Sequence, residues 1–204
     1  MTMGTVTMGT YPSVNKISAR IKNLSKLRQT AIMAVMAEYT HIIHPFPPFY
    51  DRESQILILG SFPSVKSREQ MFFYGHPQNR FWKVISAVFE EETPLSIEEK
   101  KALLRRNHIA LWDVIESCDI IGSQDSSIRN ARPTDLSAVI KGSKITRIFT
   151  NGKTSGKMFD KYQRQALGIE AVNLPSTSPA NAACSVERLA KEWAVIKDTA
   201  RSMH

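Results

Sequence analysis

The sequence predicts an α/β fold: a three-layer α/β/α sandwich around a central parallel sheet of about four strands. Short apolar runs alternate with segments of helical periodicity, an order typical of parallel strands joined by helical crossovers. The first run, QILILG at 55–60, is apolar almost throughout, as expected of a strand covered on both faces. No internal repeat divides residues 41–204, which we expect to form one domain.

The predicted strands are short, mainly apolar runs at 55–60, 108–112, 145–150 and 169–174. Upstream of the first, the Pro-rich and aromatic segment HIIHPFPPFYD at 41–51 should run extended into the sheet, because a residue before proline avoids helical backbone angles.

Helices are predicted between and after the strands, at 79–90, 96–107, 135–141, 153–167 and 185–202. Thr134 and Asp135 are candidate caps of the third helix. Ser185, followed by Glu187 and Glu192, marks the start of the last helix.

The composition is that of an ordinary globular protein. Of 204 residues, 42% are apolar and 23% are charged, which is enough to bury a core without disulfides or metals. The two cysteines, Cys118 and Cys184, lack metal-binding spacing, so we expect reduced thiols and a cytoplasmic, intracellular protein. No apolar run approaches the ~20 residues that span a bilayer.

Basic charge is concentrated at the N-terminus. The formal net charge is +8, and five basic residues precede residue 36 with no acid among them, which leaves only +3 for the rest. A basic balance favours a polyanionic partner, but this remainder is weak evidence for nucleic acid. Residues 1–40 are expected to form a basic extension, flexible or a single helix. A targeting leader, a flexible arm and a true start at Met36 are the alternatives for its first 35 residues.

The stretch from 60 to 82, GSFPSVKSREQMFFYGHPQNRFW, is the main candidate for a functional site. It begins where the first strand ends, and open α/β sheets bind ligands at the carboxyl ends of their strands. Gly60 would let the backbone approach a ligand closely. Tyr74 offers an aromatic face, His76 a titratable group, and Asn79 a neutral amide that could hold a water. Asn79 could also cap the following helix, and the two roles are compatible.

A second polar loop, LPSTSPAN at 174–181, follows the last predicted strand. In a parallel sheet it emerges at the same edge as the first loop. Its small hydroxyls, held between two prolines, form a stiff turn whose backbone N–H groups could face phosphates. The two loops together would close a cleft.

These motifs resemble those of the uracil-DNA glycosylase superfamily, and within it the hypoxanthine-DNA (deoxyinosine) glycosylase branch, over residues 41–200. GSFPS is similar to the first superfamily motif, YGHPQNRFW to the corresponding segment of the mismatch-specific branch, and LPSTSPAN to the second motif, which presses into the duplex. The chain departs from most branches at Phe62, where they carry an Asn or Asp.

The resemblance implies a monofunctional DNA-repair enzyme. It would hydrolyse the N-glycosidic bond of a flipped deaminated base, hypoxanthine or uracil, and leave an abasic site. Asn79 would be the catalytic amide and Tyr74 the aromatic side chain that stacks on the base. The other implied substrate contacts are Gly60, Ser61, Phe62 and His76. The implied DNA contacts are Ser176, Thr177, Ser178 and Asn181.

Asp113 is a further candidate substrate contact. It follows the second predicted strand, at a place where relatives of the superfamily carry an Asn that reads the base edge. A carboxylate there could accept the N1–H of hypoxanthine or the N3–H of uracil. The alternative is structural, because Asp113 and Glu116 are spaced as in a capping box that starts a helix.

No metal or other cofactor is expected. Asp113, Glu116 and Asp119 could seed a metal site, but their spacing is more typical of a solvated helix face. GKTSGK at 152–157 lacks the first glycine of a P-loop and is expected to be a strand-end turn that opens a helix.

A second function stays open because Phe62 has no group that could orient water: a lesion- or mismatch-binding protein without turnover. Under either function we expect a monomer that binds DNA containing a deaminated base and no membrane.

Overall fold

The computed structural model describes residues 38–197. Nearly all of the predicted basic extension, and the final residues of the helix predicted at 185–202, therefore lie outside the described residues.

A four-stranded parallel sheet forms the centre of the described chain, in the order β3-β2-β6-β7. Its strands are β2 (Ile56–Gly60), β3 (Ile109–Asp113), β6 (Arg147–Asn151) and β7 (Ala171–Leu174). Every residue of β2 and β3 is buried, as the continuous apolar runs predicted. Each of the four predicted strands is confirmed to within two residues at its start and one at its end.

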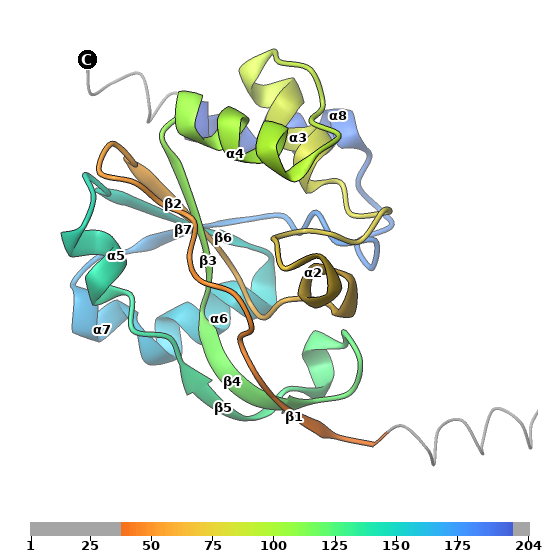
Figure 1. Ribbon diagram of the computed structural model, residues 1–204, viewed down its shortest axis with the longest axis vertical. Helices are drawn as coiled ribbons and strands as arrows, with labels where there is room; N and C mark the ends of the chain where they lie inside the picture. The colour runs from red at the N-terminus through yellow and green to blue at the C-terminus, as the bar shows by residue number, and fades with distance from the viewer. Residues whose placement is uncertain (1–37, 198–204) are drawn as a thin grey trace, which may run out of the picture. The chain divides into compact units, whose positions relative to one another are not determined.

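Helices cover both faces of this sheet, which confirms the three-layer prediction (Figure 1). One face carries α3 (Phe81–Phe89), α4 (Ile97–Arg106) and α8 (Val186–Trp193). The other carries α5 (Ser137–Lys141), α6 (Lys153–Tyr162) and α7 (Arg164–Leu167). The large core lies between these layers and the sheet.

The predicted helix caps are confirmed in part. The Ser185 side chain accepts a hydrogen bond from the N–H of Arg188 at the start of α8 (3.3 Å). Thr134 does not cap α5, because its buried hydroxyl has no hydrogen-bond partner among the described residues. Asp135 accepts from the N–H of Ser137 (2.9 Å), just ahead of that helix.

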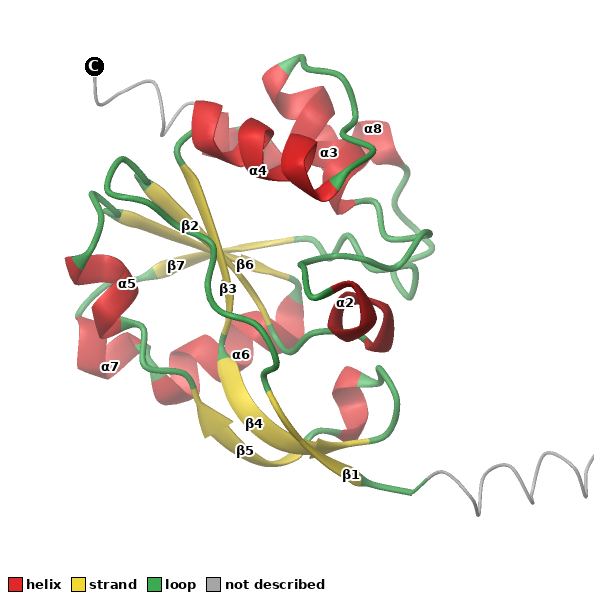
Figure 2. Cartoon of the chain, in the orientation of Figure 1, coloured by secondary structure: helices red, strands yellow, loops and turns green. Residues whose placement is uncertain are grey.

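A second sheet, which the sequence did not predict, lies beside the first (Figure 2). It is antiparallel, in the order β1-β4-β5, and consists of β1 (Thr40–Ile43), β4 (Ile115–Ile120) and β5 (Arg129–Pro133). β3 continues through Val114 directly into β4, so neither the capping box at Asp113 nor the solvated helix face forms. The N–H groups of Val114 and Ile115 instead bond to the carbonyls of Gly60 and Ser61 (3.0 and 3.2 Å).

A second, small core joins residues of β4 to the loop that follows β2. Phe62, Ile115, Cys118 and Ile120 form it, with the ring of Phe62 only 7% exposed. The position at which this chain departs from most superfamily branches is thus occupied by a core side chain. Cys118 and Cys184 are free thiols.

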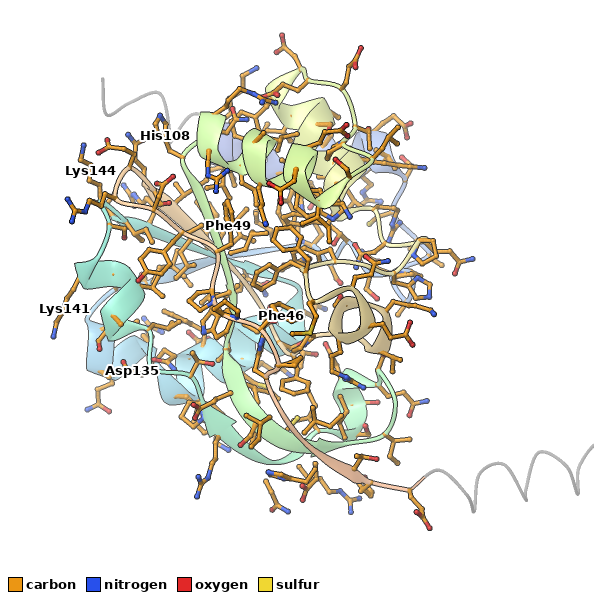
Figure 3. The ribbon with its side chains drawn as sticks, in the orientation of Figure 1. Phe46, Phe49, His108, Asp135, Lys141 and Lys144 are labelled. Carbon is orange, nitrogen blue, oxygen red and sulfur yellow. The ribbon has the colours of Figure 1, made fainter. Side chains whose placement is uncertain are left out.

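The segment between β1 and β2 runs extended, as predicted, and covers the first sheet. Phe46 and Phe49, labelled in Figure 3, lie on it. Phe46 is buried and packs edge-on against Phe73, with ring centroids 4.9 Å apart. The main chain of Phe49 pairs with Leu111 of β3.

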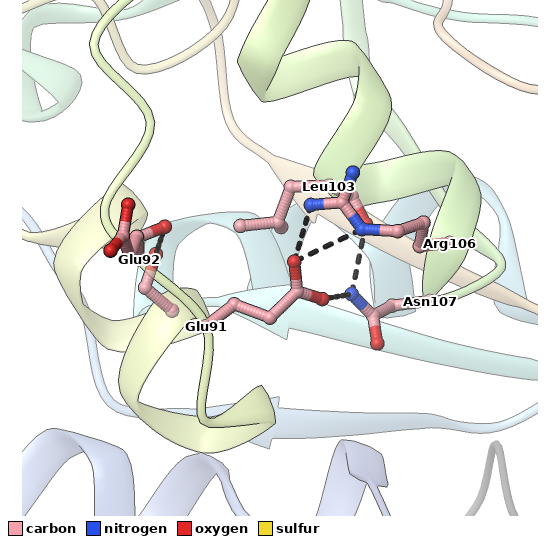
Figure 4. A network of polar contacts seen from close by, with 6 residues as sticks. Glu91, Glu92, Leu103, Arg106 and Asn107 are labelled. Atoms are coloured by element: carbon pink, nitrogen blue, oxygen red, sulfur yellow. Dashed lines mark hydrogen bonds and ion pairs between the residues drawn. The ribbon is translucent and has the colours of Figure 1, made fainter.

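A polar network ties the end of α3 to the end of α4 (Figure 4). Glu91 accepts hydrogen bonds from the Arg106 guanidinium and from Asn107 Nδ2, the latter at 2.6 Å. Burial alone would raise the pKa of Glu91, but these hydrogen bonds lower it. The network fixes the turn at the far end of α3 from Asn79.

Candidate active site

A cleft of about 1200 Å³ opens at the carboxyl ends of the parallel strands, the edge at which open α/β sheets bind ligands. Side chains from both predicted motifs line it, together with Asp113. The predicted residues in this lining are Gly60, Ser61, Phe62, Tyr74, Asn79, Asp113, Ser176, Ser178 and Asn181. The spacing of the two loops along the sheet edge therefore brings them to one cleft, as predicted.

Two predicted contacts are not in this lining. His76 Nδ1 accepts a hydrogen bond from the N–H of Gln78 (3.2 Å), which lies in its own loop. Thr177 is fully buried, so its hydroxyl is not exposed to a ligand. It contacts Asn79 instead.

Asn79 is held by a hydrogen-bond network that joins the two loops. Its Oδ1 accepts from the N–H of Phe81 (3.0 Å), at the start of α3, and from the Thr177 hydroxyl (3.0 Å). Asn151, at the end of β6, donates from Nδ2 to the Thr177 hydroxyl (2.9 Å) and accepts the N–H of Thr177 on Oδ1 (2.9 Å). Both lone pairs of Asn79 Oδ1 are thus used.

The orientation of the Asn79 amide follows from these bonds. Because Oδ1 has two donors, the amide cannot turn without losing both of them. The described residues offer no acceptor to Nδ2, and the half-buried side chain lines the cleft. Asn79 therefore presents N–H groups to a ligand. Because Asn79 lies in the loop ahead of the helix, α3 begins two residues later than predicted.

Arg80 holds the second loop from inside. Its Nε donates to the carbonyl of Thr177 (3.3 Å), and its Nη2 donates to those of Ser178 (2.6 Å) and Asn181 (2.9 Å). Its Nη1 donates to the carbonyl of Cys184. One planar guanidinium thus organises a turn that offers few backbone bonds of its own. This role could not be predicted from the sequence, because a basic residue near the start of a helix is usually an exposed side chain.

We expect Arg80→Lys to lower the melting temperature by about 4 °C or more, because a single ammonium cannot bond four carbonyls in a plane. Circular dichroism melts of the two proteins measure this. Arg188→Lys is the matched control, since the exposed Arg188 pairs, within residues 38–197, with Glu192 alone, one helical turn away. Equal melting temperatures for Arg80→Lys and the unmodified protein would contradict the assignment.

Asp113 is a buried carboxylate at the end of β3, and His44 binds it. His44 Nε2 lies 2.9 Å from Asp113 Oδ2, and both side chains are nearly fully buried. The imidazole ring packs against Phe46 and Trp112, with ring centroids 4.5 and 4.2 Å away. Sequence reasoning missed His44, because its partner lies 69 residues along the chain.

Position 60 requires glycine because neighbouring side chains approach its backbone closely, and not because of its φ angle. A Cβ atom at this position would lie 2.2 Å from Asp113 Oδ1 and 3.6 Å from the Tyr74 hydroxyl oxygen. Any side chain at Gly60 would therefore displace the Asp113 carboxylate.

Tyr74 stacks on the protein itself. Its ring lies 3.8 Å from that of Phe81 and within 18° of parallel, so one ring face is already covered. Its backbone is left-handed (φ 52°), a costly conformation for an aromatic residue. Burial, and then the charge of Asp113, raises the pKa of the phenol. The hydroxyl therefore stays protonated at neutral pH.

Ser61 donates to a carboxylate that the sequence did not single out. Its hydroxyl bonds Asp125 Oδ2 (2.7 Å), and Asp125, in the short helix η1 (Asp125–Ser127), also lines the cleft. Asp125 is an exposed residue, but desolvation of its carboxylate by the surrounding protein raises its pKa, the bond from Ser61 opposes that shift, and the charge of Asp113 adds to it.

The GKTSGK segment is a strand-end turn that opens a helix, as predicted: Gly152 (φ 98°) precedes α6. Lys153 is the one lysine that the described part of the chain contributes to the cleft lining. Within residues 38–197, no three His, Cys, Asp or Glu side chains gather as metal ligands would. Nor does that range contain a helix long and apolar enough to cross a membrane.

The fold and the site define an α/β/α protein with its cleft at the carboxyl edge of a parallel sheet. The chain belongs to the uracil DNA glycosylase superfamily, whose family model matches residues 47–200. It is similar to a protein of Methanosarcina acetivorans named hypoxanthine DNA glycosylase, with 36% identity over 74% of this chain and 95% of that protein. A protein of the same name from Methanosarcina barkeri is 34% identical over 67% of this chain and 86% of its own length.

The chain is also similar to a solved structure over most of its length. This is the solution NMR structure of a Methanosarcina acetivorans protein assigned provisionally as a uracil DNA glycosylase. The TM-score is 0.66 at 34% sequence identity, and the match covers 78% of this chain and 99% of that one.

Proposed function

We propose that the protein is a monofunctional DNA glycosylase that hydrolyses the N-glycosidic bond of a deaminated base, hypoxanthine foremost, and leaves an abasic site. The observation that carries this proposal is the Asn79 amide, fixed from the second loop and presented to a cleft of about 1200 Å³. The similarity to two proteins named hypoxanthine DNA glycosylase supports the choice of base. The protein would act inside the cell, as a monomer.

The substrate must leave the duplex before it can react. A stacked base cannot reach Asn79, so the nucleotide is extruded into the cleft at a cost of a few kcal/mol. Hypoxanthine opposite thymine is mispaired, which lowers this cost and gives selectivity before any contact is made. Ser176, Ser178 and Asn181 line the cleft on the second loop, where they would hold the strand around the extruded nucleotide.

Asn79 would act on the water or on the sugar. Its Nδ2 can donate to the oxygen of a water and leave a lone pair of that water directed at the sugar, or donate to an oxygen of the strained nucleotide. Preorganised N–H groups in a site that excludes bulk water stabilise developing charge without reorganisation. Asp113 Oδ1, which lies against Gly60 in the lining of the cleft, would accept the ring N–H of the base.

The experiment is cleavage of a duplex oligonucleotide that carries one deoxyinosine, followed by alkali. We expect strand scission at the lesion only after alkali, because a monofunctional enzyme leaves the abasic strand intact. Scission without alkali would indicate a lyase step, for which Lys153 is the available amine. Binding without scission would support the second candidate, a lesion reader, which Phe62 in the place of a catalytic amide favours.

The buried hydroxyl of Thr177 gives a prediction of its own. Thr177→Val keeps the shape but leaves Asn79 Oδ1 and Asn151 Nδ2 each short of a partner. We expect about a tenfold lower single-turnover rate on deoxyinosine and a melting temperature lower by about 4 °C or more. Thr177→Ser keeps the hydroxyl and is the matched control. A full rate in Thr177→Val would show that Asn79 is oriented without it.

A further inference from the structure

Two unsatisfied polar atoms meet at the floor of the cleft. Asp113 Oδ1 and the Tyr74 hydroxyl both converge on Gly60, at 2.2 and 3.6 Å from the position a Cβ atom would take there. Among the described residues, no hydrogen bond reaches Oδ1, since His44 bonds Oδ2. In the same part of the chain, the proton of the buried Tyr74 hydroxyl has no acceptor, although the Asn151 side chain lies close enough, as a hydrogen-bond donor, to oppose the rise in the pKa of the phenol that burial causes. One atom is an acceptor that lacks a donor, and the other is a donor that lacks an acceptor.

His44 fixes the acceptor. Its Nε2 bonds Asp113 Oδ2, while its buried Nδ1 has no partner in the described part of the chain. We therefore assign the imidazole proton to Nε2, from which it is donated to Asp113 Oδ2. The rings of Phe46 and Trp112 pack against the imidazole and restrict its movement. The carboxylate cannot rotate without losing this bond, so Oδ1 stays directed over Gly60.

We propose that Tyr74 and Asp113 together read the edge of the extruded base on which a ring N–H adjoins a carbonyl, with His44 as the positioning residue for Asp113. The inference rests on the proposed function and explains which bases its site would select. Asp113 Oδ1 accepts the N–H, and the Tyr74 hydroxyl donates to the neighbouring oxygen. Tyr74 thereby acts through its hydroxyl, while one face of its ring stacks on Phe81.

Tyr74 and Asp113 together would distinguish a deaminated base from the adenine or cytosine that it derives from. Hypoxanthine presents N1–H beside O6, and uracil presents N3–H beside O4. Adenine and cytosine present a ring nitrogen lone pair beside an amino group, which would set the lone pair against the Asp113 carboxylate. A site with buried polar groups discriminates strongly against a ligand that leaves them unpaired. Guanine shares the N1–H and O6 edge, and its intact pairing with cytosine makes extrusion costlier.

The local cost of Tyr74 supports a functional role. A buried hydroxyl whose proton has no acceptor among the described residues and a left-handed backbone at an aromatic residue both destabilise the fold. Such departures from local rules are concentrated at functional sites.

The test compares Tyr74→Phe with the unmodified protein on duplexes that carry non-cleavable 2′-fluoro nucleotides. One holds the deoxyinosine analogue. The other holds the deoxynebularine analogue, a purine with neither N1–H nor O6. We expect the ratio of the two dissociation constants to fall about tenfold toward unity in Tyr74→Phe, the worth of one hydrogen bond to a neutral group. An unchanged ratio would overturn the proposal.

Stability gives a second readout of Tyr74→Phe. Removing a buried hydroxyl whose proton has no acceptor should leave the melting temperature unchanged or raise it, while the selectivity is lost. A lower melting temperature with equal weakening on both duplexes would show a structural role instead and would also overturn the proposal.

His44 has its own pair of variants. His44→Phe keeps an aromatic ring but removes the donor, and we expect the same loss of selectivity as in Tyr74→Phe. His44→Gln keeps a donor near the position of Nε2. In this variant the logarithm of the ratio of the two dissociation constants should be at least half of that in the unmodified protein. Equal selectivity in His44→Phe and the unmodified protein would remove His44 from the proposal.

Because these are binding ratios, they are informative even without turnover. Selective binding with no cleavage of deoxyinosine would refute the proposed hydrolysis and support this edge recognition. Cleavage of deoxyinosine, together with an unchanged ratio of dissociation constants in Tyr74→Phe and His44→Phe, would support the proposed hydrolysis and refute the edge recognition.

Discussion

Replacing Asn79 by alanine should lower the single-turnover rate of deoxyinosine cleavage by about 10²–10³-fold, the usual effect of removing one preorganised donor from a reaction site. Its affinity for the same duplex should fall by less than about tenfold, because the second loop that contacts the strand remains. Quenched-flow cleavage with enzyme in excess measures the rate, and titration of a fluorescent duplex measures the affinity.

The matched control for Asn79→Ala is Gln78→Ala. Gln78 is the exposed neighbour in the same loop, and its side chain does not line the cleft. We expect this control to keep the rate within about twofold, as is usual for surface changes. A rate above one-tenth of the original in Asn79→Ala would mean that the chemistry lies elsewhere, with Asp125 as the next residue to change.

The second large effect is expected at Asp113→Asn. The carboxamide has the same shape, but His44 Nε2–H would bond its oxygen and so turn the NH₂ group toward the cleft. That group would then oppose the N1–H of hypoxanthine, donor against donor. We expect about a 100-fold lower kcat/KM on deoxyinosine, as when a charged hydrogen bond is lost and a buried group is left unpaired.

The control for Asp113→Asn is Asp119→Asn, which changes an aspartate of β4 that bonds His41 and Asn130 outside the cleft lining. A sharper comparison is the double variant His44→Phe with Asp113→Asn. Without the His44 donor the carboxamide can rotate and offer its oxygen, so the double variant should be more active than Asp113→Asn alone. Unchanged hypoxanthine and uracil cleavage in Asp113→Asn would remove this residue from the site.

The central sheet could be predicted because its strands are buried on both faces. A run such as Ile56–Gly60 is apolar throughout, and such a run bounded by loop residues has few alternatives to a parallel strand. The predicted sheet also located both loops, because the carboxyl ends of parallel strands lie at the same edge of a sheet. Asn79 and the loop at 174–181 were therefore predicted to share a cleft, and they line the same one.

The antiparallel sheet could not be predicted from local patterns. β4 (IESCDI) has a buried face and a polar face, but its residues after Asp113 also fit a capping box. What decides between them is pairing with β1 and β5, and the residues of β1 lie more than seventy positions upstream. Helix α2 (Val65–Gln70) was missed for a related reason, since it depends on the Ser64 cap and not on an apolar stripe.

The residues that hold the site side chains in place were the hardest to predict from the sequence. Thr177 bonds Asn79 across 98 positions of the chain and Asn151 across 26. A serine- and threonine-rich loop predicts phosphate contacts by composition, and composition does not tell which hydroxyl turns inward. The family resemblance implied that Tyr74 stacks on a base, and the structure places Phe81 against one face of its ring, at a residue with left-handed backbone.

The most direct test of the account is the release of free base from a duplex with a single deoxyinosine, measured by mass spectrometry with enzyme in excess. One hypoxanthine per duplex should appear, with the strand intact until alkali is added, and Asn79→Ala should release it at least about 100 times more slowly. A duplex that is bound but yields no free hypoxanthine would contradict the account.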